Sequence, residues 1–145
     1  MVLTREADYA VRIMERLCRD HTQRVAACTL AQSAGVTQRF TLKILHKLVE
    51  AGLAVSFKGP HGGYQPARPP EEITLLQVLE AVEGPYMLSR CQKEDYTCDY
   101  CGDGCRFQRI YNEVTALVRE KLGGYTFADL CRHCLLYTSD AADDR

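Results

Sequence analysis

Four cysteines lie close together in the polar segment CQKEDYTCDYCGDGC, which covers residues 91–105. Their spacing is Cys91-x6-Cys98-x2-Cys101-x3-Cys105. Thiolates are soft ligands that select iron–sulfur clusters, zinc or copper(I). Structural zinc usually takes two short cysteine knuckles, and the x6 step is too long for one of them. The wide, even spacing of the first, second and fourth cysteines therefore favours an iron–sulfur cluster, with zinc and unligated thiols as the alternatives.

The start of the chain indicates the compartment in which these thiols act. The first residues, MVLTREADYA, are charged and lack the apolar core of a secretory signal. No apolar run reaches the roughly 18 residues that a membrane span needs. We therefore expect a cytoplasmic protein with no membrane partner, whose eight cysteines are ligands, sensors or apolar fillers and not disulfides. Cys18, on the apolar stripe of a helical segment, is expected to be such a filler.

Charge divides the 145-residue chain into two parts. The formal net charge is −1, and a composition of 46% apolar and 26% charged residues is that of an ordinary globular protein. Residues 1–69 carry ten Lys or Arg against five Asp or Glu, a net charge of +5, so the remainder has a net charge of −6. A basic half joined to an acidic, cysteine-rich half predicts a polyanion-binding part and a separate regulatory part.

Apolar periodicity in the basic half predicts three consecutive helices. The first runs from the N-cap Thr4 to about Arg19. A short second helix begins with a capping box of Thr29 and Gln32 and stops at Gly35. The third helix follows after a turn, which is the order of elements in a helix-turn-helix.

The third predicted helix, between Thr37 and Gly52, has the chemistry of a major-groove recognition helix. Its predicted inward face is apolar and consists of Leu42, Leu45, Leu48 and Val49. Its predicted outward face is polar and basic, and we expect it to contact DNA through Gln38, Arg39, Thr41, Lys43, His46 and Lys47. The alternative is a generic helical hairpin with a solvated basic face.

A β-hairpin is predicted directly after the recognition helix. LAVSF forms a short strand from Leu53 to Phe57, KGPHGG a tight turn, and YQPA the returning strand. A hairpin in this place is a wing, and Lys58 and His61 at its tip are expected to reach phosphates or a narrow minor groove. A purely structural hairpin is the alternative.

Pro69 and Pro70 separate the wing from two further helices. TLLQVLEAVEG carries a second capping box, Thr74 with Gln77, and is predicted to pack on the DNA-binding part. RFQRIYNEVTALVREKLGG predicts a long helix after the cysteines, followed by a short closing helix capped by Thr126. The long helix suits a two-fold interface, or else packs on its own domain. Its apolar seam consists of Phe107, Ile110, Tyr111, Val114, Leu117, Val118 and Leu122.

Taken together, these motifs resemble the Rrf2 family of winged-helix transcriptional regulators. LTREADYAVRIM, the helix-turn-helix, GPHGGY, and three spaced cysteines ahead of a long helix carry the resemblance over residues 2–133. The resemblance implies a homodimer that binds a palindromic operator in double-stranded DNA. It also implies that each subunit carries an iron–sulfur cluster held by Cys91, Cys98 and Cys105.

The resemblance leaves the fourth cluster ligand open. IscR-like members place a histidine three residues after the last cysteine, where this chain has Gln108. NsrR-like members can use a carboxylate from the first helix of the partner subunit, and the matching residue is Asp8. The alternative for Asp8 is a structural role, because the helix dipole favours an acid in the first turn of a helix. Cys101 is the other candidate, because it completes four thiolates from one loop. Either ligand favours a [4Fe-4S] cluster over [2Fe-2S].

The sequence thus predicts a mainly α protein with a small β-hairpin wing and three parts. These are a winged helix-turn-helix DNA-binding domain (1–69), a packing helix and connector (70–88), and a cysteine cluster loop with a dimerisation helix (89–133). Residues 134–145 resemble the translated end of a sequencing adapter, and we interpret them as a non-native read-through tail.

The predicted function is that of a DNA-binding repressor whose operator affinity is controlled by the cluster as it senses nitric oxide, redox or iron status. The alternative is a winged-helix DNA-binding protein with a structural zinc site and no redox sensing. An enzyme is not expected, because the sequence contains no nucleophile elbow, phosphate loop or plausible triad.

Overall fold

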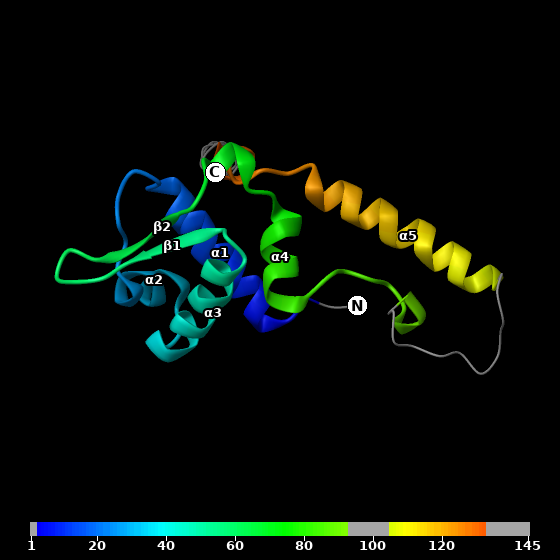
Figure 1. The fold of residues 1–145 in the computed structure, drawn as a ribbon, viewed down its shortest axis with the longest axis horizontal. Coiled ribbons are helices and arrows are strands. Elements are labelled where there is room, and N and C mark those ends of the chain that lie inside the picture. Colours follow the sequence, from blue (N-terminus) through cyan, green and yellow to red (C-terminus); the bar gives the residue numbers. More distant parts are fainter. Residues whose placement is uncertain (1–2, 93–104, 133–145) are drawn as a thin grey trace, which may run out of the picture.

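The computed structural model describes residues 3–92 and 105–132, and Figure 1 shows its fold. The elements, in chain order, are α1 (Arg5–Arg19), α2 (Ala27–Ala34), α3 (Gln38–Glu50), β1 (Ala54–Phe57), β2 (Gly63–Pro66), η1 (Pro70–Glu72), α4 (Leu75–Glu83), η2 (Arg90–Gln92) and α5 (Arg106–Gly123). Residues 127–132 are also helical. The mainly α fold with an antiparallel hairpin confirms the predicted fold class.

The apolar core lies between α1, α3, α4 and the base of the hairpin. Helix α1 begins as predicted, because Thr4 Oγ1 accepts a hydrogen bond of 3.1 Å from the backbone N–H of Ala7. Cys18 is only 3% exposed, which confirms its reading as an apolar filler. The core consists of Ala10, Ile13, Met14, Leu17, Cys18, Val25, Leu30, Ile44, Leu45, Leu48, Leu53, Ala54, Ile73, Val78 and Phe127.

Helix α2 begins earlier than the sequence suggested. Its N-cap is Ala26, which makes no side-chain capping bond, so the predicted capping box of Thr29 and Gln32 is wrong. Val25 and Tyr64 exchange two backbone hydrogen bonds of 2.9 Å, and this pairing sets the point at which the chain turns into the helix. The predicted stop at Gly35 is confirmed, with a left-handed φ of 72°.

Helix α3 begins after its predicted N-cap Thr37, but its buried stripe differs from the prediction. Thr41 is fully buried and not outward-facing, because its hydroxyl donates a hydrogen bond of 3.0 Å to the carbonyl of Thr37. Ile44 is also buried, whereas Leu42, predicted to lie inward, is 42% exposed. Burying a satisfied hydroxyl costs little, so the helix is rotated from the face that apolar residues alone indicated.

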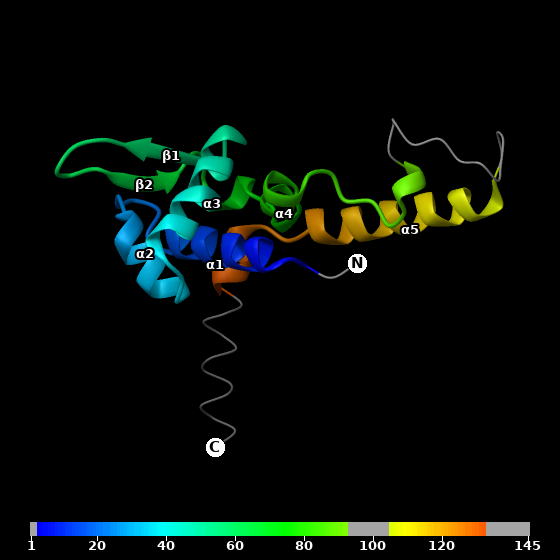
Figure 2. The same cartoon turned by 90° about the horizontal axis from the view of Figure 1, so that it is seen from below.

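The hairpin is paired from Ala54 with Pro66 to Phe57 with Gly63. In Figures 1 and 2 its tip points away from the rest of the molecule, and α5 extends in the opposite direction. The predicted winged helix-turn-helix arrangement is therefore present, and η2 and the N-terminal end of α5 lie at the end of the molecule opposite the wing tip.

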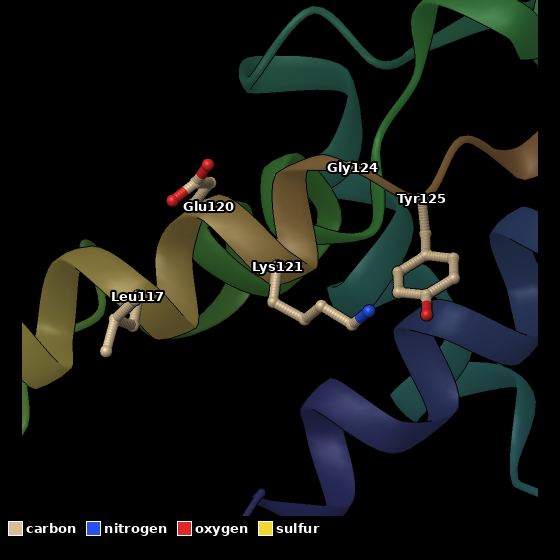
Figure 3. Close-up of a pocket in the computed structure, with 5 residues that line it drawn as sticks. All are labelled: Leu117, Glu120, Lys121, Gly124 and Tyr125. Atoms are coloured by element: carbon tan, nitrogen blue, oxygen red, sulfur yellow. The ribbon is translucent and has the colours of Figure 1, made fainter.

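After α5 the chain returns to the core. Leu75 N donates to the carbonyl of Tyr125 and Phe127 N to the carbonyl of Ile73, each at 2.9 Å, and Phe127 is fully buried. Figure 3 shows Lys121 reaching toward the ring of Tyr125, with 5.3 Å from the ammonium to the ring centroid. These contacts fix the C-terminal end of α5 to the DNA-binding part.

The predicted capping box of Thr74 with Gln77, which opens α4, is confirmed.

The remainder of α5 is largely solvent-exposed. Its single buried residue is Thr115. Three apolar residues of the predicted seam are more than half exposed, Phe107 at 62%, Ile110 at 52% and Leu117 at 65%. Within residues 3–92 and 105–132, none of the helices combines the length and apolar character needed to cross a membrane.

Candidate DNA interface and cysteine site

The N-terminal end of α3 presents two of the predicted DNA-contacting residues to solvent. Gln38 and Arg39 are both exposed in its first turn. Further along, His46 is 73% exposed and lies 3.2 Å from Glu50 on the same helix. These three side chains are therefore accessible, as the predicted contact with a major groove requires.

The two lysines of α3 are bound to an acid that the sequence interpretation missed. Glu6 of α1 lies 2.7 Å from the Lys47 ammonium and 3.9 Å from that of Lys43, and its side chain is only 19% exposed. The helix dipole alone explains an acid in the first turn of a helix. The sequence therefore gave no sign that Glu6 also pairs with lysines of another helix. The contact joins α1 to the recognition helix and offsets part of its positive charge.

The wing tip carries the remaining two predicted DNA residues. Lys58 and His61 are both exposed in the turn between β1 and β2. Gly59, with φ of 97°, permits the tight turn between them. Of the predicted DNA-contacting residues, those at the wing tip are accessible to solvent. Thr41 is the exception to the prediction, because it is buried in the core of the protein.

Two of the predicted cluster cysteines fall within the described residues and lie at the two ends of the cysteine loop. Cys91 belongs to η2, and Cys105 is the N-cap of α5. Gln108 Nε2, in the first turn of α5, donates a hydrogen bond of 3.1 Å to the carbonyl of Cys91. This contact brings Cys91 beside the turn that Cys105 begins. Cys98 and Cys101 lie outside the described residues.

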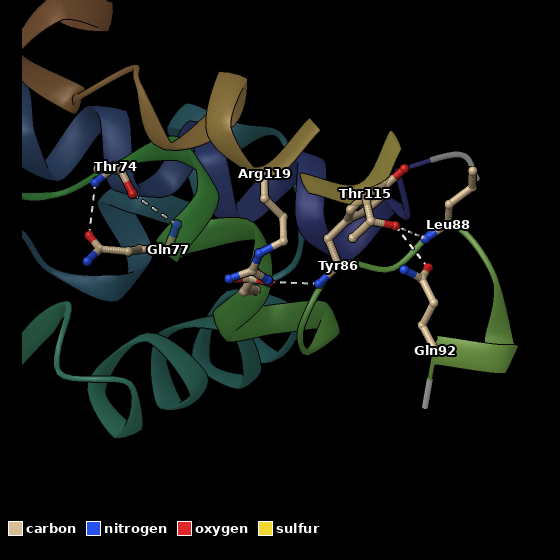
Figure 4. A network of polar contacts seen from close by, with 8 residues as sticks. Thr74, Gln77, Tyr86, Leu88, Gln92, Thr115 and Arg119 are labelled. Carbon is tan, nitrogen blue, oxygen red and sulfur yellow. Dashed lines mark hydrogen bonds and ion pairs between the residues drawn. The ribbon is translucent and has the colours of Figure 1, made fainter. Parts of the chain in front are cut away.

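A network of polar contacts fixes the first end of the loop along α5, and Figure 4 shows its central part. Thr115 Oγ1 accepts a hydrogen bond of 3.0 Å from the N–H of Leu88 and donates one of 2.9 Å to Gln92 Oε1. Gln92 Nε2 donates to Asn112 Oδ1 at 2.6 Å. With Gln108 and Arg119, these α5 residues follow helical spacing and form what we call the polar face of α5: Gln108, Asn112, Thr115 and Arg119.

The polar face continues to the DNA-binding part through α4. Arg119 forms an ion pair with Glu80, whose Oε2 also accepts a hydrogen bond of 2.7 Å from Tyr86 N. One turn later, Glu83 Oε1 accepts a hydrogen bond of 2.9 Å from the N–H of Thr4, the N-cap of α1. Hydrogen bonds and ion pairs therefore connect the segment next to Cys91 with the start of α1.

Asp8, one of the two candidates for the fourth ligand, lies on α1. Its carboxylate is 54% exposed and 3.3 Å from Arg12 Nε. Among residues 3–92 and 105–132 of one chain, no three His, Cys, Asp or Glu side chains come together as a metal site. Within a single chain, Asp8 is therefore not assembled with Cys91 and Cys105.

The two described cysteines have the chemistry that a metal group held by thiolates needs. The contact from Gln108 to Cys91 places two soft donors at neighbouring ends of one loop. Cys91 Sγ also lies 3.1 Å from the hydroxyl of Ser89, and hydrogen bonds to ligating sulfur are a usual part of such sites. Cys18 by contrast lies in the apolar core at 3% exposure, and burial raises the pKa of its thiol, as expected for an apolar filler.

Comparisons with known proteins agree on one family. A family model described as Rrf2, iron-dependent transcriptional regulator, matches residues 3–133. Protein aau3 of Rhizobium meliloti is 31% identical over 136 residues, covering 91% of this chain and 86% of its own length. The HTH-type transcriptional regulator NsrR of Shouchella clausii is 29% identical over 132 residues, covering 90% and 88%.

Solved structures show the same fold. CymR, the global cysteine regulator of B. subtilis, superposes with a TM-score of 0.74 at 22% identity, covering 92% of this chain and 98% of its own. IscR of T. potens superposes with a TM-score of 0.70 at 21% identity, covering 92% and 88%.

Proposed function

The chain belongs to the Rrf2 family of DNA-binding transcriptional regulators, and we propose that an iron–sulfur cluster controls its affinity for operator DNA. The observation that carries the proposal is the contact between Gln108 and Cys91, which holds the two described ends of the cysteine loop side by side. Within this proposal the protein acts as a repressor in the cytoplasm, where thiolates stay reduced.

The DNA-binding mode follows from the recognition helix and wing. In the proposed complex, α3 enters the major groove with Gln38, Arg39, Lys43, His46 and Lys47, and the wing brings Lys58 and His61 to the backbone. Exposed apolar residues of α5 support a homodimer, because a stripe of this kind is usually covered by a partner. We call this stripe the apolar face of α5; it consists of the exposed Phe107, Ile110 and Leu117 with the half-buried Val114. A two-fold dimer would read a palindromic operator.

The proposed cluster ligands are Cys91, Cys98 and Cys105. The fourth is Asp8 of the partner subunit or Cys101, and both choices favour [4Fe-4S]. Asp8 is suited to this role because its carboxylate is more than half exposed and engaged only with Arg12 among the described residues. When bound, the cluster supplies a tie between the cysteines that nitric oxide, oxidation or iron loss can break.

The polar face of α5 supports a route by which the loop acts on DNA binding. Gln108 and Thr115 hold the segment next to Cys91 against α5. Arg119 and Glu80 then join α5 to α4, and Glu83 holds the N-cap of α1. Since α1 is bound to α3 through Glu6, a displaced loop would turn the DNA-binding part as one body, and the recognition helix with it, relative to α5. A coupling of about 1–3 kcal/mol is enough for a regulatory response.

Metal analysis and DNA binding together test the proposal. Protein purified without oxygen is assayed for iron, sulfide and zinc, and its affinity is measured for a duplex selected from a random-sequence pool, before and after nitric oxide. We expect iron and sulfide in equal amounts and a change in affinity of about fivefold or more. Zinc without sulfide, with affinity indifferent to nitric oxide, would instead support the structural zinc alternative.

The fourth ligand is tested with a matched pair of variants. Asp8→Ala removes both the proposed ligand and the ion pair with Arg12, whereas Arg12→Ala removes only the ion pair. If Asp8 is the ligand, Asp8→Ala alone alters the visible spectrum of the cluster and hastens its loss in air. If both variants keep the wild-type spectrum and Cys101→Ser does not, Cys101 is the ligand.

A further inference from the structure

Arg24, which lies between α1 and α2, makes two contacts with the wing. The carbon at the centre of its guanidinium lies 3.9 Å from the ring centroid of Phe57, the last residue of β1. Its Nη1 donates a long hydrogen bond of 3.5 Å to the carbonyl of His61, in the turn at the tip. One side chain from outside the hairpin thus contacts both a strand end and the turn.

The backbone that carries Arg24 is itself fixed to the wing. Its neighbour Val25 exchanges hydrogen bonds of 2.9 Å in both directions with Tyr64 of β2. Gly63, with φ of 147°, lets the two backbones meet, since a Cβ there would lie 2.8 Å from the carbonyl oxygen of Val25. The backbone next to Arg24 is therefore hydrogen-bonded to β2, and its guanidinium extends from there toward the wing tip.

The contact from Arg24 falls on the part of the hairpin that lies beyond the paired strands. A two-stranded hairpin is marginally stable by itself, and the register of β1 and β2 ends at the pair of Phe57 with Gly63. Residues 58–62 lie beyond that last pair and include the proposed DNA-contacting residues Lys58 and His61. The hydrogen bond from Arg24 reaches into this turn, and the stack on Phe57 fixes the direction in which the guanidinium points.

We propose that Arg24 is a positioning residue for DNA binding, which holds the wing tip so that Lys58 and His61 meet the DNA backbone. The proposal rests on the DNA-binding activity alone and is independent of the cysteine site. The competing role is a direct phosphate contact by Arg24, because its side chain is exposed. The two roles differ chemically: a planar guanidinium can stack on a ring and donate in a fixed direction, whereas a lysine ammonium keeps the charge without that geometry.

Four single variants and one double variant, all full-length, separate these roles, with affinity measured on a duplex selected from a random-sequence pool by the wild-type protein. Arg24→Lys keeps the charge, Arg24→Ala removes it, and Phe57→Leu removes the ring under an unchanged Arg24. We expect each to weaken binding about fivefold to tenfold, because each releases the tip. Lys58→Ala alone should weaken binding similarly, and its combination with Arg24→Ala should weaken it no further than the stronger single change.

The salt dependence of binding supplies a readout that altered stability alone would not change. Arg24→Lys conserves the charge of the protein. If it nevertheless releases Lys58 from the DNA backbone, the slope of log affinity against log salt concentration should fall by about one phosphate contact. Thermal unfolding midpoints should stay close to wild type, since Arg24 is exposed. Binding by Arg24→Lys within about twofold of wild type, or multiplying losses in the combination with Lys58→Ala, would overturn the positioning role in favour of a direct contact. Unchanged binding by every Arg24 variant would exclude both roles.

Discussion

Helices α1 and α5 differ in the way each is held to the rest of the protein. Helix α1 buries six apolar residues: Ala7, Ala10, Ile13, Met14, Leu17 and Cys18. The longer α5 buries only Thr115, a polar residue, and contacts its own chain chiefly through its polar face and its C-terminal end. Its apolar face remains exposed on roughly the opposite side.

This difference separates a rigid part from an adjustable one. Burial of a large apolar side chain stabilises a protein by about 1.5–3 kcal/mol, so α1 cannot move without losing much of the core. A typical hydrogen bond contributes only about 0.5–1.5 kcal/mol, so the polar face of α5 can be released at small cost. A regulator that must shift one part against another gains from this arrangement, and the following changes test it.

The largest effect is expected from Leu45→Ala in the DNA-binding part. Leu45 is fully buried, and its truncation should lower the free energy of unfolding by about 2–5 kcal/mol. Leu42→Ala is the matched control on the same helix, because Leu42 is 42% exposed and should change that free energy by less than about 0.5 kcal/mol. Urea denaturation measures both, and similar losses for the two would contradict the orientation of α3.

A smaller, local effect is expected from Thr115→Val in α5. The valine keeps the shape but leaves the N–H of Leu88 and Oε1 of Gln92 without the hydroxyl, a cost of about 1–3 kcal/mol. Amide exchange of residues 86–92 should accelerate while exchange in α1 stays unchanged. Thr115→Ser, which retains the hydroxyl, should behave like the wild type, and equal exchange in both variants would show that the hydroxyl does not hold the segment.

The sequence predicted the DNA-binding part better than the cysteine part, because apolar burial holds the first and polar contacts hold the second. Apolar burial in α1 and α4 follows the helical repeat, so their bounds and the caps Thr4, Thr37 and Thr74 could be placed from local pattern. The error at Thr41 arose because its buried hydroxyl is satisfied within its own helix, which no apolar pattern reports.

Polar contacts between distant segments leave no such pattern. Gln108 stood out only as the place where some relatives have a histidine, and its bond to the Cys91 carbonyl joins residues 17 positions apart. Thr115 lay between the apolar positions of α5 and gave no sign of its bond to Leu88, 27 positions away. The cysteines themselves were identifiable because their chemistry, and not their packing, singles them out.

A modest effect on DNA affinity is expected from Glu6→Gln. This change frees Lys43 and Lys47 from their ion pairs and raises the positive charge beside α3. Affinity for a mixed-sequence duplex should increase about threefold to tenfold at low salt, with a steeper salt dependence. Glu72→Gln changes the net charge equally at an exposed residue of η1, and an equal gain from it would show that only total charge matters.

The smallest effect is expected at the Cys18 thiol, whose ionisation should not affect stability at neutral pH. Burial raises the pKa of its thiol from 9.0 to about 12, with smaller contributions from Cys131, Glu71 and Glu15. Because the pKa of Cys18 is higher in the folded state, the stability that the protonated thiol contributes is complete below about pH 9 and is lost as the pH rises toward 12.

Iodoacetamide at neutral pH should modify the exposed Cys28 and leave the buried Cys18 intact in the native protein. Mass spectrometry of the digested protein measures both, and equally rapid modification would mean that the core opens readily at the end of α1.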